Sequence, residues 1–112
     1  MEFPAIPDEG RWSSLTLIEQ MANIGSEVGR TLKWMSGSKP QMAAGAYIRA
    51  LDLMDLTIKV GRAGTLGRAP LLRELCRCRD VFTEAVSTSN LEDLKWVDRY
   101  FAQFAKSYSS KY

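Results

Sequence analysis

Apolar residues recur at steps of three and four in four separate segments of this 112-residue chain. This spacing places them along one side of an α-helix, because each helical residue turns by about 100°. The segments cover about residues 17–35, 39–60, 70–86 and 89–106, and short connections join them. No sustained apolar–polar alternation of the strand type occurs. We therefore predict an all-α protein, folded as an up-down antiparallel four-helix bundle, because short connections favour antiparallel neighbours.

The expected core consists of the larger apolar side chains on these stripes. They are Leu17, Met21, Ile24, Val28, Leu32, Tyr47, Leu51, Met54, Ile58, Leu75, Phe82, Leu94, Val97, Phe101 and Phe104.

Two sequence signatures mark helix starts, and two glycines mark a close helix contact. Thr16–Glu19 and Ser89–Glu92 both match the capping box, in which side chains satisfy free amides at the start of a helix. Gly25 and Gly29 each cost about 1 kcal/mol inside a helix relative to alanine. The simplest reason to keep them is the close approach of a neighbouring helix.

The first dozen residues include Pro4, Pro7 and Gly10 and predict an irregular N-terminal arm, residues 1–12. Trp12 is expected to fasten the end of this arm to the body. A single bundle domain, residues 13–112, follows. No apolar run approaches the roughly 20 residues that a membrane span needs, and no signal-peptide pattern opens the chain. We expect a cytoplasmic protein with no membrane partner.

The composition argues against several chemistries. The chain has no histidine and only two cysteines, Cys76 and Cys78, which a helix would point about 200° apart. A structural zinc site is therefore not expected, and no other metal or cofactor is predicted. Catalysis that depends on a histidine base is excluded as well.

Charged and polar residues follow helical spacing beside the apolar stripes. The segment 17–35 carries Asn23, Glu27 and Arg30, and the segment 39–60 carries Arg49, Asp52 and Asp55. These groups form ordinary surface charge, converge in a partly buried polar network with a structural role, or make a functional site.

Four stretches resemble a family of small prokaryotic helical proteins with no established activity. They are residues 23–28, 49–58, 73–79 and 100–105, and the resemblance covers about residues 11–106. It implies a helical protein of a bacterium or archaeon and no catalytic role. The polar positions that match are the candidate site residues Asn23, Glu27, Arg30, Arg49, Asp52, Asp55, Arg77 and Arg79.

Three functional hypotheses remain open. The first is a non-catalytic, self-assembling protein that forms homo-oligomers, with a dimer favoured, and binds a protein partner of unknown identity. Trp96 and Tyr100 are its candidate interface, because they lie off the core stripe and such aromatics are enriched at interfaces.

The two alternatives rest on charge. The basic segment from Arg62 to Arg79, which includes Arg68, Arg73 and Arg77, is a candidate nucleic-acid contact. Asp52 and Asp55 are one helical turn apart, the spacing with which helical nucleotide hydrolases hold magnesium. The first helix carries no matching acidic pair.

Overall fold

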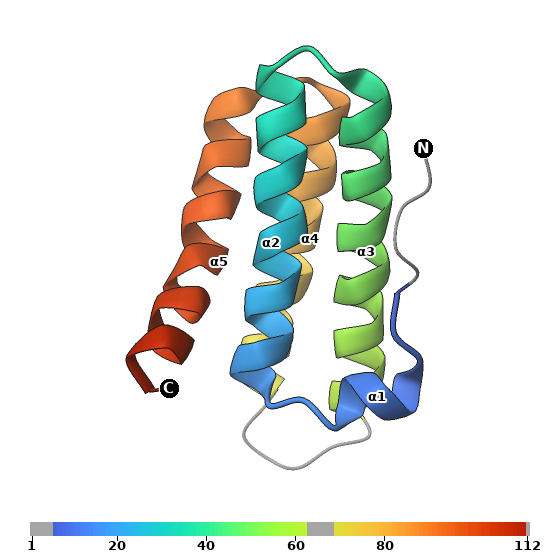
Figure 1. The fold of residues 1–112 in the computed structure, drawn as a ribbon, viewed down its shortest axis with the longest axis vertical. Coiled ribbons are helices and arrows are strands. Elements are labelled where there is room, and N and C mark those ends of the chain that lie inside the picture. The colour runs from blue at the N-terminus through green and yellow to red at the C-terminus, as the bar shows by residue number, and fades with distance from the viewer. Residues whose placement is uncertain (1–5, 63–68, 112) are drawn as a thin grey trace.

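The computed structural model describes residues 6–62 and 69–111, and no residue in these ranges lies in a strand. Five helices follow one another along the chain (Figure 1). The all-helical prediction is therefore confirmed for the described residues, with one helix more than predicted. The helices are α1 (Glu9–Ser13), α2 (Leu17–Ser36), α3 (Pro40–Arg62), α4 (Ala69–Ser87) and α5 (Leu91–Lys111).

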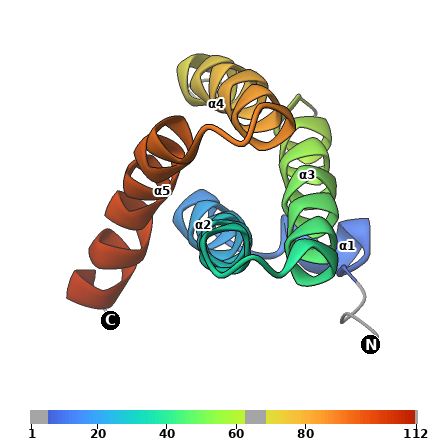
Figure 2. The ribbon, with the colours of Figure 1, turned by 90° about the horizontal axis from the view of Figure 1, so that it is seen from above.

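The long helices surround a common core. Figure 2 shows α2 between α3 and α5, with α4 on the far side next to the same two helices. The short helix α1 lies across one end of the molecule, beside α3. Among the described helices, none combines the length and the apolar character needed to cross a membrane.

The start of α2 follows the predicted capping box. Thr16 Oγ1 accepts a hydrogen bond from the Glu19 amide at 3.1 Å, and Glu19 Oε1 accepts one from the Thr16 amide at 2.9 Å. These two bonds satisfy amide groups that the helix itself cannot pair. The prediction of the capping box at Thr16 is confirmed.

The start of α5 lies one residue later than predicted. Asn90, and not Ser89, caps this helix, with its Oδ1 accepting from the Asp93 amide at 3.1 Å. Ser89 has a φ of 54° and closes the end of α4, where its amide donates to the Val86 carbonyl. An N-cap needs extended backbone, so a left-handed Ser89 is unable to fill that position.

The predicted irregular arm is wrong for residues 9–12, which belong to α1. Asp8 caps this helix, accepting from the Arg11 amide at 2.8 Å. Trp12 is only 2% exposed, and its indole nitrogen donates to Thr57 Oγ1 on α3 at 2.8 Å. Pro7 and Gly10 disfavour a helix in this segment. Burial of the large Trp12 side chain stabilises the short helix nevertheless. The expected fastening of the arm by Trp12 is confirmed.

Most of the predicted core is buried, including Met21, Ile24 and Phe82. The remaining predicted members are partly exposed and pack around the buried ones; they are Leu17, Leu32, Tyr47, Leu51, Ile58 and Phe104. The sequence interpretation left Trp12 out of the core. It also left out three polar residues of α2, Gln20, Glu27 and Thr31, which the structure buries.

The contact between α2 and α5 is close because Gly25 has no side chain. A Cβ atom placed on Gly25 would lie 2.9 Å from the Cβ of Phe101, which is nearer than such atoms approach in proteins. At Gly29 a Cβ atom would lie 3.3 Å from the Asp98 carboxylate. The predicted close helix approach at these glycines is confirmed.

Candidate functional site

Four of the eight candidate site residues line a single cavity between α2 and α3. Its volume is about 470 Å³. Helix α2 contributes Asn23, Ser26, Glu27 and Arg30, which occupy positions i, i+3, i+4 and i+7 and so share one side of the helix. Helix α3 contributes Arg49 and Leu53, which lie one turn apart. The helical spacing seen in the sequence therefore corresponds to a real hollow in the molecule.

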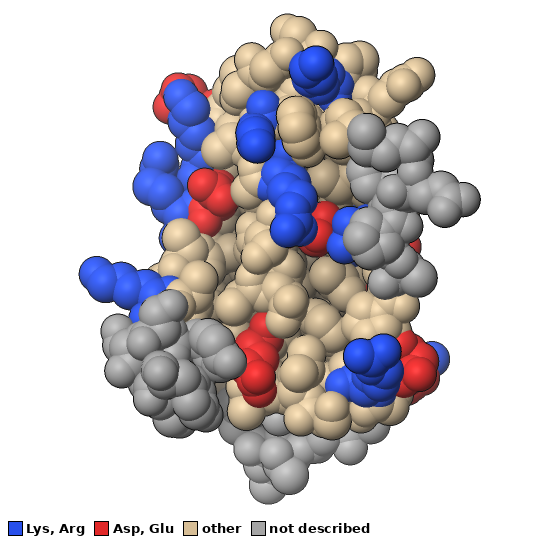
Figure 3. All heavy atoms as spheres, in the orientation of Figure 1, with Lys and Arg blue, Asp and Glu red and all other residues tan. Residues whose placement is uncertain are grey.

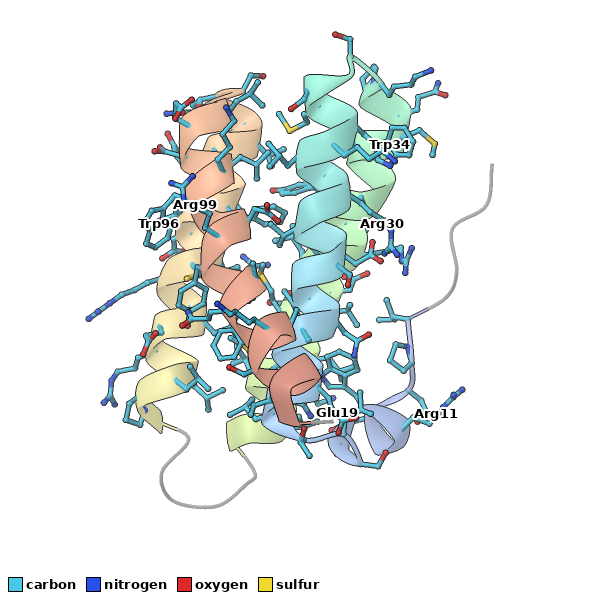
Figure 4. The ribbon with its side chains drawn as sticks, turned by 60° about the vertical axis from the view of Figure 1, so that its left-hand side comes forward. Arg11, Glu19, Arg30, Trp34, Trp96 and Arg99 are labelled. Carbon is cyan, nitrogen blue, oxygen red and sulfur yellow. The ribbon has the colours of Figure 1, made fainter. Side chains whose placement is uncertain are left out.

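The third wall of the cavity comes from the N-terminal segment. Ile6 and Pro7 precede α1, Arg11 and Trp12 lie on it, and Leu15 follows it. Figure 4 shows Arg30 projecting from α2 toward the side on which this segment runs, with Arg11 on the same side. The N-terminal segment thus forms one wall of the cavity, beside α2 and α3.

Glu27 is the central charge of this cavity. Its side chain is 3% exposed, its Oε1 atom accepts a hydrogen bond from Arg30 Nη1, and the same oxygen forms an ion pair with Arg49 Nη2 at 2.9 Å. Its second oxygen, Oε2, has no hydrogen-bond partner among the described residues, and neither has Arg49 Nε. One carboxylate oxygen therefore holds two guanidinium groups, one from each helix.

This arrangement leaves the cavity cationic. Three basic residues, Arg11, Arg30 and Arg49, are among its lining residues, together with one acidic residue, Glu27. Arg49 is mostly buried, with 20% of its side chain exposed, whereas Arg30 is 55% exposed. On the face drawn in Figure 3, basic and acidic side chains are otherwise interspersed. The lining residues of the cavity thus carry more positive than negative charge.

The other four candidate residues lie elsewhere. Asp55 on α3 accepts a two-point contact from Arg79 on α4, with Nε 2.8 Å and Nη2 3.1 Å from its two oxygens. This hydrogen bond raises the pKa of Arg79. The pair is partly exposed, so its contribution to stability is small. Asp52 and Arg77 are exposed and do not line the cavity.

The candidate interface residues differ from each other in their surroundings. Trp96 is 48% exposed on α5, on the side of the molecule opposite Arg30 (Figure 4). Tyr100 is half-buried; its ring stacks on Trp96 at 6.2 Å between centroids, and its hydroxyl donates to Glu74 Oε1 on α4 at 2.9 Å. Burial, together with this hydrogen bond, raises the pKa of Tyr100. Tyr100 thus joins α5 to α4, while Trp96 presents an open aromatic face.

The described residues give little geometric support to the magnesium-dependent hydrolase hypothesis and to the nucleic-acid hypothesis. Asp55 is already held by Arg79, and no described group of three or more Cys, Asp or Glu residues is arranged to hold a metal ion. In the basic segment, Arg73 and Arg77 are exposed on α4. The side chain of Arg62 and the whole of Arg68 lie outside the described residues, so the nucleic-acid hypothesis stays a prediction.

The sequence interpretation missed the N-terminal wall of the cavity. Residues 1–12 were expected to form an irregular arm, and Arg11 was not a candidate. One signal was available: Asp8 followed by Glu9 is typical of a helix start, because both carboxylates stabilise the first turn. It pointed to α1, but not to the cavity that α1 closes.

Comparisons with known protein families, with curated proteins and with solved structures find no match to this chain. The resemblance described above stays a prediction, and the cavity has to be interpreted from its own chemistry.

Proposed function

We propose that this protein binds a small anion in the cavity between α2 and α3. The observation that carries the proposal is the buried Glu27 carboxylate, which holds two guanidinium groups against a hollow of about 470 Å³. Guanidinium groups bind carboxylates and phosphates strongly because they donate parallel, charge-assisted hydrogen bonds. A volume of this size lies within the range of small-molecule sites.

The electrostatics of the cavity favour an anion over a cation or a neutral molecule. A single carboxylate compensates only part of the charge of Arg11, Arg30 and Arg49. Charges held at a partly buried position interact more strongly than charges in water, because the surrounding dielectric constant is lower. An anion placed here removes the excess charge and supplies acceptors for the guanidinium groups.

The test is titration calorimetry of the full chain with phosphate, sulfate, acetate and citrate at low ionic strength. We expect binding of at least one of these anions, and Arg30→Gln is expected to weaken it about tenfold or more, since a charge-assisted hydrogen bond contributes roughly 1.5–3 kcal/mol. Arg77→Gln is the matched control, because Arg77 is an exposed arginine on α4 outside the cavity. Equal losses in both variants, or no binding by any anion, would refute the proposal.

Self-association through α5 is a second candidate function, and the exposed ring of Trp96 favours it. In this hypothesis the protein is a non-catalytic homo-oligomer, a dimer first, which also binds a protein partner. Sedimentation of the wild type and of Trp96→Ala tests it. We expect the substitution to shift the protein toward monomer; an identical distribution for both proteins would exclude Trp96 from the interface.

We further propose that the long helices form an up-down antiparallel four-helix bundle. We also propose that the protein is located in the cytoplasm. In support, successive long helices run in opposite directions in Figure 1. Cys76 and Cys78 are free thiols, as is usual in a reducing compartment.

A further inference from the structure

The lining of the α2–α3 cavity has two chemically different parts. The charged part consists of Glu27, Arg30 and Arg49, which face one another across the two helices. The apolar part comes from the N-terminal segment and from α3, and its members include Ile6, Leu15 and Leu53. A ligand that fills the cavity therefore meets cationic groups and hydrocarbon at the same time.

Ile6 exposes part of its apolar side chain beside the cavity. Few large apolar side chains in the described chain are more than a third exposed, and Ile6, at 38%, is one of them. It is also the one of these that lines the cavity, whereas Ile48 and Trp96 lie elsewhere. Exposed apolar surface beside a concave site is typical of ligand-binding grooves.

We infer that the ligand is an organic acid with a single acid group and an apolar body. This inference rests on the proposed anion-binding function. The acid group, a carboxylate or a phosphate ester, binds the guanidinium groups of Arg30 and Arg49. The hydrocarbon body packs against Ile6, Leu15 and Leu53. A bare inorganic anion would use only the charged part and leave the apolar wall in water.

The experiment compares acids that share a head group and differ in their hydrocarbon. Full-length protein is titrated with acetate, butanoate and hexanoate, with hexyl phosphate and inorganic phosphate, and with hexan-1-ol. We expect affinity to rise about two- to fourfold for each methylene added, because each one is removed from water on binding. A comparison of the affinities for hexanoate and hexyl phosphate shows which acid group the site prefers.

Two isoleucines supply a matched pair of variants. Ile6→Ser is expected to reduce the advantage of hexanoate over acetate at least fivefold. Ile48→Ser is the control, since Ile48 is exposed on α3 at 56% and does not line the cavity. Both side chains are exposed, so neither change threatens folding. Arg30→Gln is expected to weaken every acid in the series.

The outcomes separate this inference from the proposed function. If acetate, hexanoate and inorganic phosphate bind equally and Ile6→Ser has no effect, the inference is wrong while anion binding stands. If hexan-1-ol binds as tightly as hexanoate, or if no acid binds at all, the anion-binding function fails and the inference fails with it.

Discussion

The Oε1 atom of Glu27 lies 2.9 Å from Arg49 Nη2, and this contact joins α2 to α3 at a position where the carboxylate is almost fully buried. The same oxygen also accepts from Arg30, one turn further along α2. Glu27 therefore determines where both guanidinium groups lie, and it stabilises the helix contact at the same time.

Glu27→Gln is expected to destabilise the fold and to weaken anion binding. Breaking a buried ion pair costs about 3–5 kcal/mol, and we expect roughly 2–3 kcal/mol here because both arginines keep some contact with water. Anion binding weakens because Arg30 and Arg49 lose their anchor. Urea unfolding and calorimetric titration measure the two effects.

The sign of the binding change is the decisive result for Glu27. If the cavity attracted anions through its net charge alone, removal of a carboxylate would tighten binding. Tighter binding by the glutamine variant would therefore contradict a positioning role for Glu27. Asp52→Asn is the control, because Asp52 is an exposed carboxylate on α3 and its loss is expected to change stability by less than about 0.5 kcal/mol.

Gly25→Ala is expected to destabilise the protein, although alanine is the better helix former. The new Cβ atom would lie 2.9 Å from the Cβ of Phe101, so α2 and α5 have to move apart. Overpacking of this kind costs about 1–3 kcal/mol and outweighs the gain in helix propensity of up to about 1 kcal/mol. Gly29→Ala is the comparison, because its nearest neighbour is the movable Asp98 carboxylate at 3.3 Å. Equal unfolding midpoints for the two variants would disprove the contact.

Thr57→Val is expected to lower the free energy of unfolding by about 1–3 kcal/mol, because it leaves the buried indole N–H of Trp12 without an acceptor. Trp12→Phe removes the donor from the same bond. In the double variant the two losses are expected to be less than additive. Strict additivity in a double-mutant cycle would show that the bond contributes nothing to stability.

Stability is expected to fall at alkaline pH in a way that depends on Cys78. Burial, and next the charge of Glu74, raise the pKa of this thiol from 9.0 to about 11. The unfolded chain therefore loses the proton first. The contribution of this group is complete below pH 9 and is lost as the pH rises through about 11. Urea midpoints between pH 8 and 11 are expected to fall less steeply for Cys78→Ala than for the wild type; parallel curves would rule out the thiol as a source of the slope.

Ser38→Gly is expected to stabilise the turn between α2 and α3. Ser38 has a φ of 56°, a left-handed conformation that costs an L-residue about 1–2 kcal/mol and glycine almost nothing. After the larger entropy of an unfolded glycine is subtracted, we expect a gain of about 0.5 kcal/mol. Ser36→Gly, inside the last turn of α2, is expected to do the opposite. A lower thermal midpoint for Ser38→Gly would contradict the strain argument.

The helices were predictable because each carries a long apolar stripe, and the stripes of α2 and α5 contain the buried Ile24 and Phe101. The turn geometry was less predictable. Glycine is the usual left-handed residue after a helix, but here Ser38 and Ser89 take that conformation, next to a glycine in one case and an asparagine in the other. The capping residue of α5 was therefore placed one position too early.

Only half of the predicted site residues line the cavity, for a physical reason. Spacing along one helix shows that Asn23, Glu27 and Arg30 share a side, but it does not show which helix lies opposite. The pairing of Glu27 with Arg49, and of Asp55 with Arg79, depends on how the helices are rotated against one another. The N-terminal wall depends on the burial of Trp12, a contact 45 residues distant along the chain.

The buried position of Trp12 also allows its intrinsic fluorescence to be used as a probe of the N-terminal wall. Its indole is buried and hydrogen-bonded and Trp12 is among the cavity-lining residues, whereas Trp96 is 48% exposed. A soluble quencher such as iodide reaches Trp96 and not Trp12. Trp34 is partly exposed, so it is replaced by phenylalanine for this measurement. The emission that survives quenching then reports on the N-terminal wall, and it shows without any attached dye whether Trp12 stays protected when the cavity is filled.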